Sequence, residues 1–151
     1  MIPKYHIAFG FILSLVLFLL FPSTNLIGAG IIFLSSFLID VDHYIYYIFK
    51  ERSLSLKKAI DYFLIKRREL FGLHPRERKR FYSGFCFLHG IEILVILFVS
   101  GIFISEYFLF ILIGFAFHLL LDIIEEIYRK SRLDKISIIY DWFKFKKLKK
   151  I

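Results

Sequence analysis

The sequence predicts an all-α membrane protein, a polytopic bundle of four transmembrane helices, and three observations support this prediction. Of the 151 residues, 58% are hydrophobic and 20 are phenylalanine. The mean hydropathy is +0.68, and the apolar fraction exceeds the roughly 45–50% that is usual in soluble domains. Four apolar runs each approach the ~20 residues that cross the hydrocarbon core of a bilayer. So short a chain could not cover that much apolar surface in water.

We expect the transmembrane helices over residues 5–21, 26–49, 85–104 and 107–127. The first run ends at Pro22-Ser23-Thr24-Asn25, a sequence that favours a turn. The break before residue 107 is so short that the last two runs form a tight helical hairpin. A signal peptide is the alternative for the first run, but no clear Ala-x-Ala site follows it, and the later apolar runs favour a retained anchor.

The distribution of basic residues predicts the orientation of the bundle. The chain has 21 Lys and Arg against 13 Asp and Glu. Of these basic residues, 11 lie in residues 50–80 and nine in residues 129–150; the remaining one is Lys4. The two other loops contain none. Because basic loops remain on the cytoplasmic side, we expect both termini and the 50–80 loop in the cytoplasm and the protein in the plasma membrane.

The basic segments also carry apolar residues at helical spacing. In the middle loop this pattern predicts an amphipathic interfacial helix over residues 54–71, and the basic tail, residues 128–151, repeats it around Trp142 and Phe143. Such segments bind an anionic inner leaflet, so membrane lipids are the expected partners. No nucleic-acid partner is expected, because the positive charge flanks the apolar runs.

Ionisable residues recur inside the predicted spans, although each costs ~2.5–3.5 kcal/mol to insert. At ~1.5 Å per residue, all four helices place a His or Asp within ~3–17 Å of the cytoplasmic boundary. One such residue is as well explained by an interhelical hydrogen bond or a helix cap, but a shared layer favours a metal site. The expected metal ligands are His6, Asp40, His43, His89, His118 and Asp122.

The spacing of these residues suits metal binding. Pairs three or four apart share a helix face, as do Asp40 with His43, His89 with Glu92 and His118 with Asp122. Nitrogen and carboxylate ligands fit Zn²⁺, Mn²⁺ or Fe²⁺, and we expect one or two divalent ions, Zn²⁺ or Mn²⁺.

The roles of two acidic residues remain open. Asp42 lies ~160° from Asp40 on an ideal helix, so it is either a further ligand, a support for the ligands or a general base, and Glu92 is either a ligand or a general base. Cys86, the only cysteine, is expected to pack as a small apolar side chain. Glu125 and Glu126 are expected to be solvated.

The sequence is similar to the YdjM-like membrane-bound metal-dependent hydrolases, small multi-span proteins of bacteria and archaea. The residues that carry the resemblance are His6, Asp40-Val41-Asp42-His43, Leu88-His89-Gly90, Gly114, His118 and Asp122. Many members have His-Arg-x-x-Thr-His-Ser in the third region, where this chain has Phe87-Leu88-His89-Gly90-Ile91-Glu92. The resemblance implies a metal-dependent hydrolase. Either Glu92 replaces a ligand that this chain lacks, or the chain belongs to a divergent branch with altered activity.

The leading hypothesis is therefore a metal-dependent hydrolase near the cytoplasmic leaflet, where a metal-activated water attacks an ester or phosphoester, and the depth suggests a lipid substrate. Asp42 or Glu92 is the catalytic base. The alternative is a non-catalytic metal-binding protein or a transporter of ions or protons, although the apolar segments 13–21 and 103–114 argue against a conduction path. A scaffold without a site is the third possibility.

Overall fold

The computed structural model describes residues 3–78, 80–82, 84–130 and 136–150, and helices dominate them. The predicted all-α class is confirmed, apart from one pairing of two short strands. The chain forms two compact units. Unit 1 comprises Met1–Ile39 and Gly90–Asp122, and unit 2 comprises Asp40–His89 and Ile123–Ile151. Residues 131–135 and 151 of the predicted basic tail lie outside the described residues.

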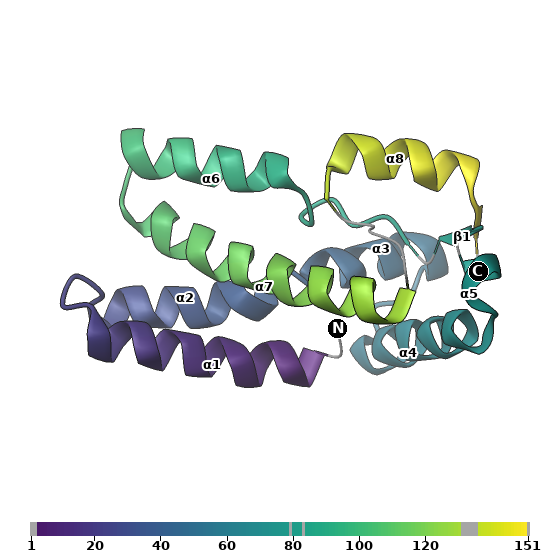
Figure 1. The fold of residues 1–151 in the computed structure, drawn as a ribbon, viewed down its shortest axis with the longest axis horizontal. Coiled ribbons are helices and arrows are strands. Elements are labelled where there is room, and N and C mark those ends of the chain that lie inside the picture. Colours follow the sequence, from purple (N-terminus) through teal and green to yellow (C-terminus); the bar gives the residue numbers. More distant parts are fainter. Residues whose placement is uncertain (1–2, 79, 83, 131–135, 151) are drawn as a thin grey trace. The chain divides into compact units, whose positions relative to one another are not determined.

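Unit 1 consists of two helical hairpins. Helices α1 (Pro3–Leu20) and α2 (Leu26–Leu38) lie side by side, and α6 (Ile91–Phe103) is joined by a short turn to α7 (Tyr107–Lys130), as Figure 1 shows. The first turn falls where the sequence predicts it. The side chain of Asn25 ends this turn by accepting a hydrogen bond of 2.8 Å from the Gly28 N–H, which caps α2.

Small residues let the helices of unit 1 approach closely. Ser14 on α1 donates a hydrogen bond of 2.7 Å to the Ala29 carbonyl on α2. On α7, a Cβ added to Gly114 would lie only 2.7 Å from the Ile32 carbonyl oxygen of α2. Small side chains at helix contacts are typical of packing inside membranes, where apolar burial gives no driving force for association.

The outer surface of unit 1 is apolar. Helix α6 has no buried residue, and it exposes large side chains that include Val95, Ile96, Phe98 and Ile102. In the part of the chain that the structure describes, two helical stretches are long and apolar enough to cross a membrane, Leu26–Glu51 and Tyr107–Tyr128. The apolar helices Lys4–Leu20 and Ile91–Phe103 are shorter.

The second apolar run contains two helices rather than the single helix expected over residues 26–49. Helix α2 ends at Leu38 and α3 (Val41–Glu51) follows. Ile39 and Asp40 between them keep right-handed helical backbone angles. The His43 N–H donates to the Asp40 carbonyl at 3.1 Å, a three-residue spacing that tightens the turn. The helical hydrogen-bond pattern is therefore interrupted where the predicted metal ligands begin.

The third apolar run becomes helical later than expected. The prediction of a helix over residues 85–104 is wrong for its first part, because α6 begins at Ile91 and Gly90 precedes it in an extended conformation. The two glycines Gly84 and Gly90 weaken a helix there, and Asp42 binds the Leu88 N–H. As a result, His89 lies on a loop and shares no helix face with Glu92.

Unit 2 contains α3, α4 (Leu56–Gly72), α5 (Pro75–Arg78), the end of α7 and α8 (Ile138–Lys147). Strand β1 (Phe81–Tyr82) pairs in parallel with β2 (Lys149–Lys150). Helix α4 matches the helix predicted over residues 54–71, and it begins where the Ser55 side chain accepts a hydrogen bond from the Lys58 N–H.

An ion pair between Arg67 on α4 and Glu125 on α7 links two helices of unit 2. The expectation that Glu125 and Glu126 are solvated is wrong. The Glu125 side chain is only 12% exposed, and Glu126 is 3% exposed. A cationic partner offsets part of the cost of burying a carboxylate, which the spacing along α7 alone could not reveal.

Candidate metal centres

Two groups of His, Cys and carboxylate side chains could each hold a metal ion, and each group lies within one unit. Unit 2 contains Asp42, His43, Cys86 and His89, and unit 1 contains His6, His118 and Asp122. In both groups the potential ligand atoms lie within 4.8 Å of one another. Five of the six predicted metal ligands are therefore members of these groups, and the sixth, Asp40, contacts the group in unit 2.

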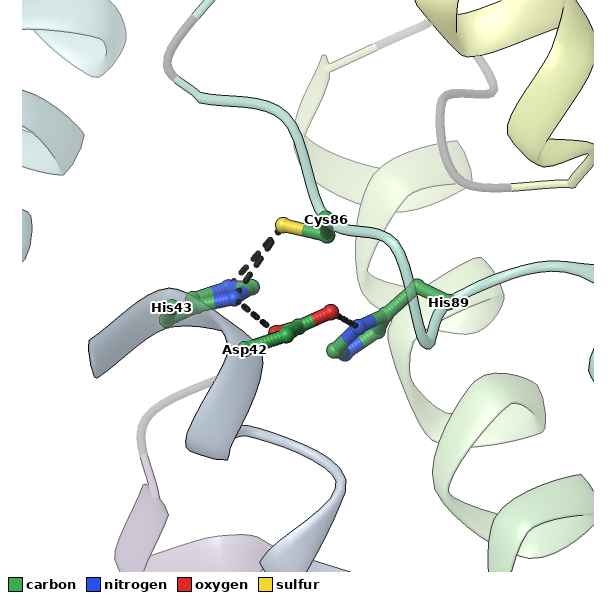
Figure 2. A group of neighbouring side chains, drawn as sticks. All are labelled: Asp42, His43, Cys86 and His89. Carbon is green, nitrogen blue, oxygen red and sulfur yellow. Dashed lines mark hydrogen bonds and ion pairs between the residues drawn. The ribbon is translucent and has the colours of Figure 1, made fainter. Parts of the chain in front are cut away.

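The group in unit 2 is built around Asp42, in the first turn of α3. Its side chain lies between the imidazole rings of His43 and His89, with Cys86 on the loop that leads to His89 (Figure 2). The Asp42 oxygens lie 2.8 Å from His43 Nδ1 and 2.8 Å from His89 Nδ1. The Leu88 N–H also donates to Asp42, at 3.0 Å. Asp42 therefore joins the loop to α3.

These contacts determine which nitrogen of each ring can bind a metal. An ionised carboxylate only accepts hydrogen bonds, so both Nδ1 atoms carry the proton. The Nε2 atoms of His43 and His89 then keep their lone pairs. A carboxylate behind a ligating histidine is a common arrangement in metal sites, where it orients the ring and makes it more basic. Asp42 is placed to act in this way.

Asp40 approaches the same two rings from their Nε2 side. Its Oδ1 lies 3.5 Å from His89 Nε2 and 3.9 Å from His43 Nε2. Nitrogen and oxygen ligands of a tetrahedral Zn²⁺ lie ~3.3 Å apart when each bond is ~2.0–2.1 Å. The two aspartates therefore contact different atoms of His89. They can do so because the helical pattern is interrupted at Asp40.

Cys86 is the member of this group that the sequence analysis did not identify. It is buried as predicted, with 5% of its surface exposed, but its Sγ lies 3.1 Å from His43 Nδ1 and 3.7 Å from His43 Nε2. The spacing Cys86-Phe87-Leu88-His89 was the available signal, because cysteine and histidine a few residues apart are frequent zinc ligands.

The group in unit 1 brings α1 and α7 together. Asp122 Oδ1 lies 3.3 Å from His6 Nε2, and Asp122 Oδ2 lies 3.7 Å from His118 Nε2. The two imidazole rings are stacked, with centroids 3.8 Å apart. His118 Nδ1–H donates to the Ser36 carbonyl at 2.8 Å, so Nε2 is the ring nitrogen that carries the lone pair.

His6 gives the clearest indication of a cation in unit 1. The residue is fully buried, and neither of its ring nitrogens makes a hydrogen bond among the described residues, because the 3.3 Å contact of Nε2 with Asp122 Oδ1 lacks hydrogen-bond geometry. A buried polar group without such a partner costs ~1–3 kcal/mol. A divalent ion between His6, His118 and Asp122 would satisfy one nitrogen and balance the buried carboxylate.

Glu92 and His74 lie elsewhere. Glu92 is in the first turn of α6 and is half-buried. Among the described residues, no group able to hold a metal includes it. His74 is exposed beside Pro75, and the Arg76 N–H lies 3.4 Å from its Nδ1.

No protein-family model, curated protein or solved structure matches this chain. The two groups of potential ligands are therefore the observations from which its function is inferred.

Proposed function

We propose that this protein is a four-span plasma-membrane hydrolase that depends on a divalent metal, Zn²⁺ or Mn²⁺, and cleaves an ester or phosphoester of a lipid near the cytoplasmic leaflet. This function is the one that the resemblance to the YdjM-like hydrolases implies. The observation that carries it is the buried carboxylate of Asp42, which holds His43 and His89 with their Nε2 atoms toward Asp40.

The proposed spans are α1, α2 with α3, α6 with the loop before it, and α7. Helix α6 has 13 residues, so it is ~20 Å long at ~1.5 Å per residue, which is less than a hydrocarbon core of ~30 Å. Residues 84–90, which precede α6 in the chain, are not helical. Membrane proteins tolerate such non-helical backbone where it is buried in protein or lines a cavity, and the bond from the Leu88 N–H to Asp42 supports this arrangement.

The orientation follows the positive-inside rule, with both termini, α4 and α8 on the cytoplasmic side. Helix α8 exposes Ile139 and Phe143, and its Lys144 Nζ lies 4.3 Å from the centre of the Tyr140 ring. Apolar side chains beside lysines are typical of helices that lie on an anionic leaflet. The basic residues of α4 and α8 would hold a negatively charged headgroup.

A bound divalent ion supplies Lewis acidity and activates water at neutral pH. The side chains of this chain would bind the ions and orient the ligands. His43 and His89 would present Nε2, Asp40 would add an oxygen ligand, and His6, His118 and Asp122 would hold a further ion. Asp42 is engaged by both Nδ1–H groups, which favours a positioning role.

Hydrolysis by the purified protein tests this proposal. The full chain in nanodiscs, loaded with Zn²⁺ or Mn²⁺, should cleave at least one member of a panel of phospholipids, lipid esters and soluble phosphoesters, and a chelator should abolish turnover. His89→Ala, which removes a proposed ligand, should lose the metal of the group in unit 2 together with the activity. Asp61→Asn, an exposed change on α4, is the matched control and should remain active. Metal-loaded protein that cleaves no substrate would contradict the enzyme proposal.

Transport of an ion or proton is the second candidate. It is favoured by the stacked, fully buried pair His6 and His118 beside Asp122 in the apolar unit 1, because buried His and Asp chains relay ions and protons in membrane proteins. Metal or proton flux into proteoliposomes, lost in His118→Ala, would support this function.

A further inference from the structure

We infer that the outward face of α8 binds an anionic lipid surface and that this binding holds in place the loop of residues 84–90, which carries His89. The lipid surface thereby regulates metal binding in unit 2. The inference rests on the proposed function for the presence of a membrane and a metal, and it goes further by naming a partner that controls the site.

Helix α8 packs on the chain segment that leads to His89. The Phe85 ring lies 5.2 Å from the Trp142 ring and 6.0 Å from the Phe145 ring, measured between centroids. The chain after α8 adds a second contact, because β2 (Lys149–Lys150) pairs in parallel with β1 (Phe81–Tyr82). Helix α8 and β2 therefore hold the start of the loop at two places.

The same segment packs closely on α3 and α4. A Cβ added to Gly84 would lie 3.3 Å from Tyr46 Cε1 and 3.6 Å from Phe63 Cε1. The Tyr46 ring also contacts the Phe145 ring of α8, with centroids 6.2 Å apart. The Phe63 ring lies 5.1 Å from the His43 imidazole. One set of aromatic contacts thus connects α8, the start of the loop and a proposed metal ligand.

The position of His89 depends on contacts of this kind. Residues 84–90 are not helical, so contacts with other segments fix the loop. The Leu88 N–H and His89 Nδ1 are bonded to Asp42, and α8 holds the loop at Phe85. Segments with few contacts of this kind open locally at a low cost in free energy. Release of α8 should therefore let the loop open and move His89 away from Asp42.

The outward face of α8 is apolar, although α8 is short and follows a basic segment. Ile139 and Phe143 are four residues apart and share one face, and these two side chains and Tyr140 are each more than half exposed. Lys147 lies four residues beyond Phe143 on the same face, and Lys146 beside it is exposed. A group of large exposed apolar side chains marks an interaction surface.

The charge of this surface favours anionic lipid as the partner. Three lysines, Lys144, Lys146 and Lys147, lie in the last turn of α8. The Lys144 Nζ lies 4.3 Å from the centre of the Tyr140 ring, and the Lys146 Nζ lies 4.8 Å from the centre of the Trp142 ring. Aromatic rings beside lysines are typical of helices at a lipid interface. A second copy of α8 would bring lysines against lysines, which is unfavourable.

Hydrogen–deuterium exchange of residues 84–90 tests the control by lipid. The full chain, without added metal, is compared in nanodiscs of phosphatidylcholine alone and of equal parts phosphatidylcholine and phosphatidylglycerol. Exchange should be slower by roughly tenfold or more with the anionic lipid, because each lysine near such a surface increases binding about fivefold. Equal exchange rates of the wild-type chain in the two lipid mixtures would overturn the inference.

A double variant removes the outward face without touching the contacts with Phe85. Ile139→Ser combined with Phe143→Ser should exchange equally fast in the two lipid mixtures. Phe103→Ser combined with Ile104→Ser is the matched control, because it changes the same two residue types at exposed positions of unit 1. This control should keep the response to anionic lipid. A full response in the α8 variant would overturn the role of this face.

Trp142 reports independently on where α8 lies, because it is the only tryptophan of the chain. Phospholipids brominated near the headgroup quench tryptophan at the interface. They should quench Trp142 strongly in the wild-type chain and more weakly in the α8 variant. If Trp142 of the wild-type chain is not quenched, α8 does not bind the lipid surface. This measurement and the wild-type exchange rates decide the question even if the variant does not fold.

These outcomes separate the inference from the proposed function, because the exchange is measured without metal. Slower exchange in anionic lipid by a chain that cleaves nothing supports the control of the loop and contradicts the hydrolase. Metal-dependent hydrolysis with equal exchange in both lipids supports the hydrolase and overturns the control. The Zn²⁺ affinity of the wild-type chain should exceed that of the α8 variant in the same anionic nanodiscs, and equal affinities would overturn the regulation of metal binding.

Discussion

Asp42 accepts a hydrogen bond of 2.8 Å from His89 Nδ1, although 47 positions separate the two residues in the chain. The contact joins the start of α3 to the loop before α6, and it determines which His89 nitrogen faces Asp40. Both residues are fully buried. One carboxylate therefore controls the orientation of the ring and its tautomer.

Replacing Asp42 by Asn should weaken metal binding without removing a ligand. The Asn side chain has one oxygen acceptor, and its NH₂ group would face the second Nδ1–H, so one ring would turn or change tautomer. We expect metal affinity to fall roughly 10–100-fold, as for other supporting residues, in a competition assay with a chromophoric chelator. Asp61→Asn on the exposed face of α4 is the control. An unchanged affinity in Asp42→Asn would show that this carboxylate does not orient the ligands.

Thiol labelling should establish the proposed topology. Cysteines introduced at Ser23 and Ser105 should react with an impermeant reagent added to intact cells, whereas Arg68→Cys on α4 should react only after the membrane is opened, because basic segments remain inside. Cys86 is buried, so the signal comes from the introduced residue. Labelling of Arg68→Cys from outside would reverse the predicted orientation.

The sequence was sufficient for features that depend on local pattern. Apolar length predicted α1 and α7, Pro22-Ser23-Thr24-Asn25 predicted the turn between α1 and α2, and amphipathic spacing predicted α4. The four-residue spacing of His118 and Asp122 on α7 correctly indicated that the two side chains share one face, with 3.7 Å between them.

Features that depend on a distant partner could not be predicted. The late start of α6 follows from the bond between the Leu88 N–H and Asp42, and hydrophobicity contains no information about that contact. Glu125 is buried because Arg67 pairs with it. Cys86 was predicted to be an apolar packing residue, because the sequence does not show that the loop brings its Sγ within 3.1 Å of His43 Nδ1. In each case the sequence does not show which residue from a distant part of the chain makes the contact.

The two groups of ligands should bind metal independently. We expect two equivalents of ion per chain by elemental analysis, one of which is lost in His118→Ala and the other in His89→Ala, because His118 belongs to the group in unit 1 and His89 to the group in unit 2. His74→Ala, which changes an exposed histidine, should keep both. If either single variant lost all bound metal, the two groups could not be independent sites.

Gly114 should be essential for the geometry of unit 1. A Cβ at this position would lie 2.7 Å from the Ile32 carbonyl oxygen and 2.9 Å from the Ser36 amide nitrogen, and these are backbone atoms that cannot rotate away. In Gly114→Ala, α7 must therefore move off α2, at a cost of roughly 1–3 kcal/mol for overpacking. His118 lies one helical turn further on the same face, so its hydrogen bond to the Ser36 carbonyl would lengthen and the ion held with His6 and Asp122 would bind less tightly.

Gly30→Ala on α2 is the matched control, because a Cβ there meets nothing within 4 Å, and alanine in a helix is more favourable than glycine by roughly 0.5–1 kcal/mol. Thermal unfolding in detergent should give a lower midpoint for Gly114→Ala and an equal or higher one for Gly30→Ala, and metal content should fall only in the former. Equal midpoints and equal metal content in the two variants would mean that the close approach of α7 to α2 does not support the site.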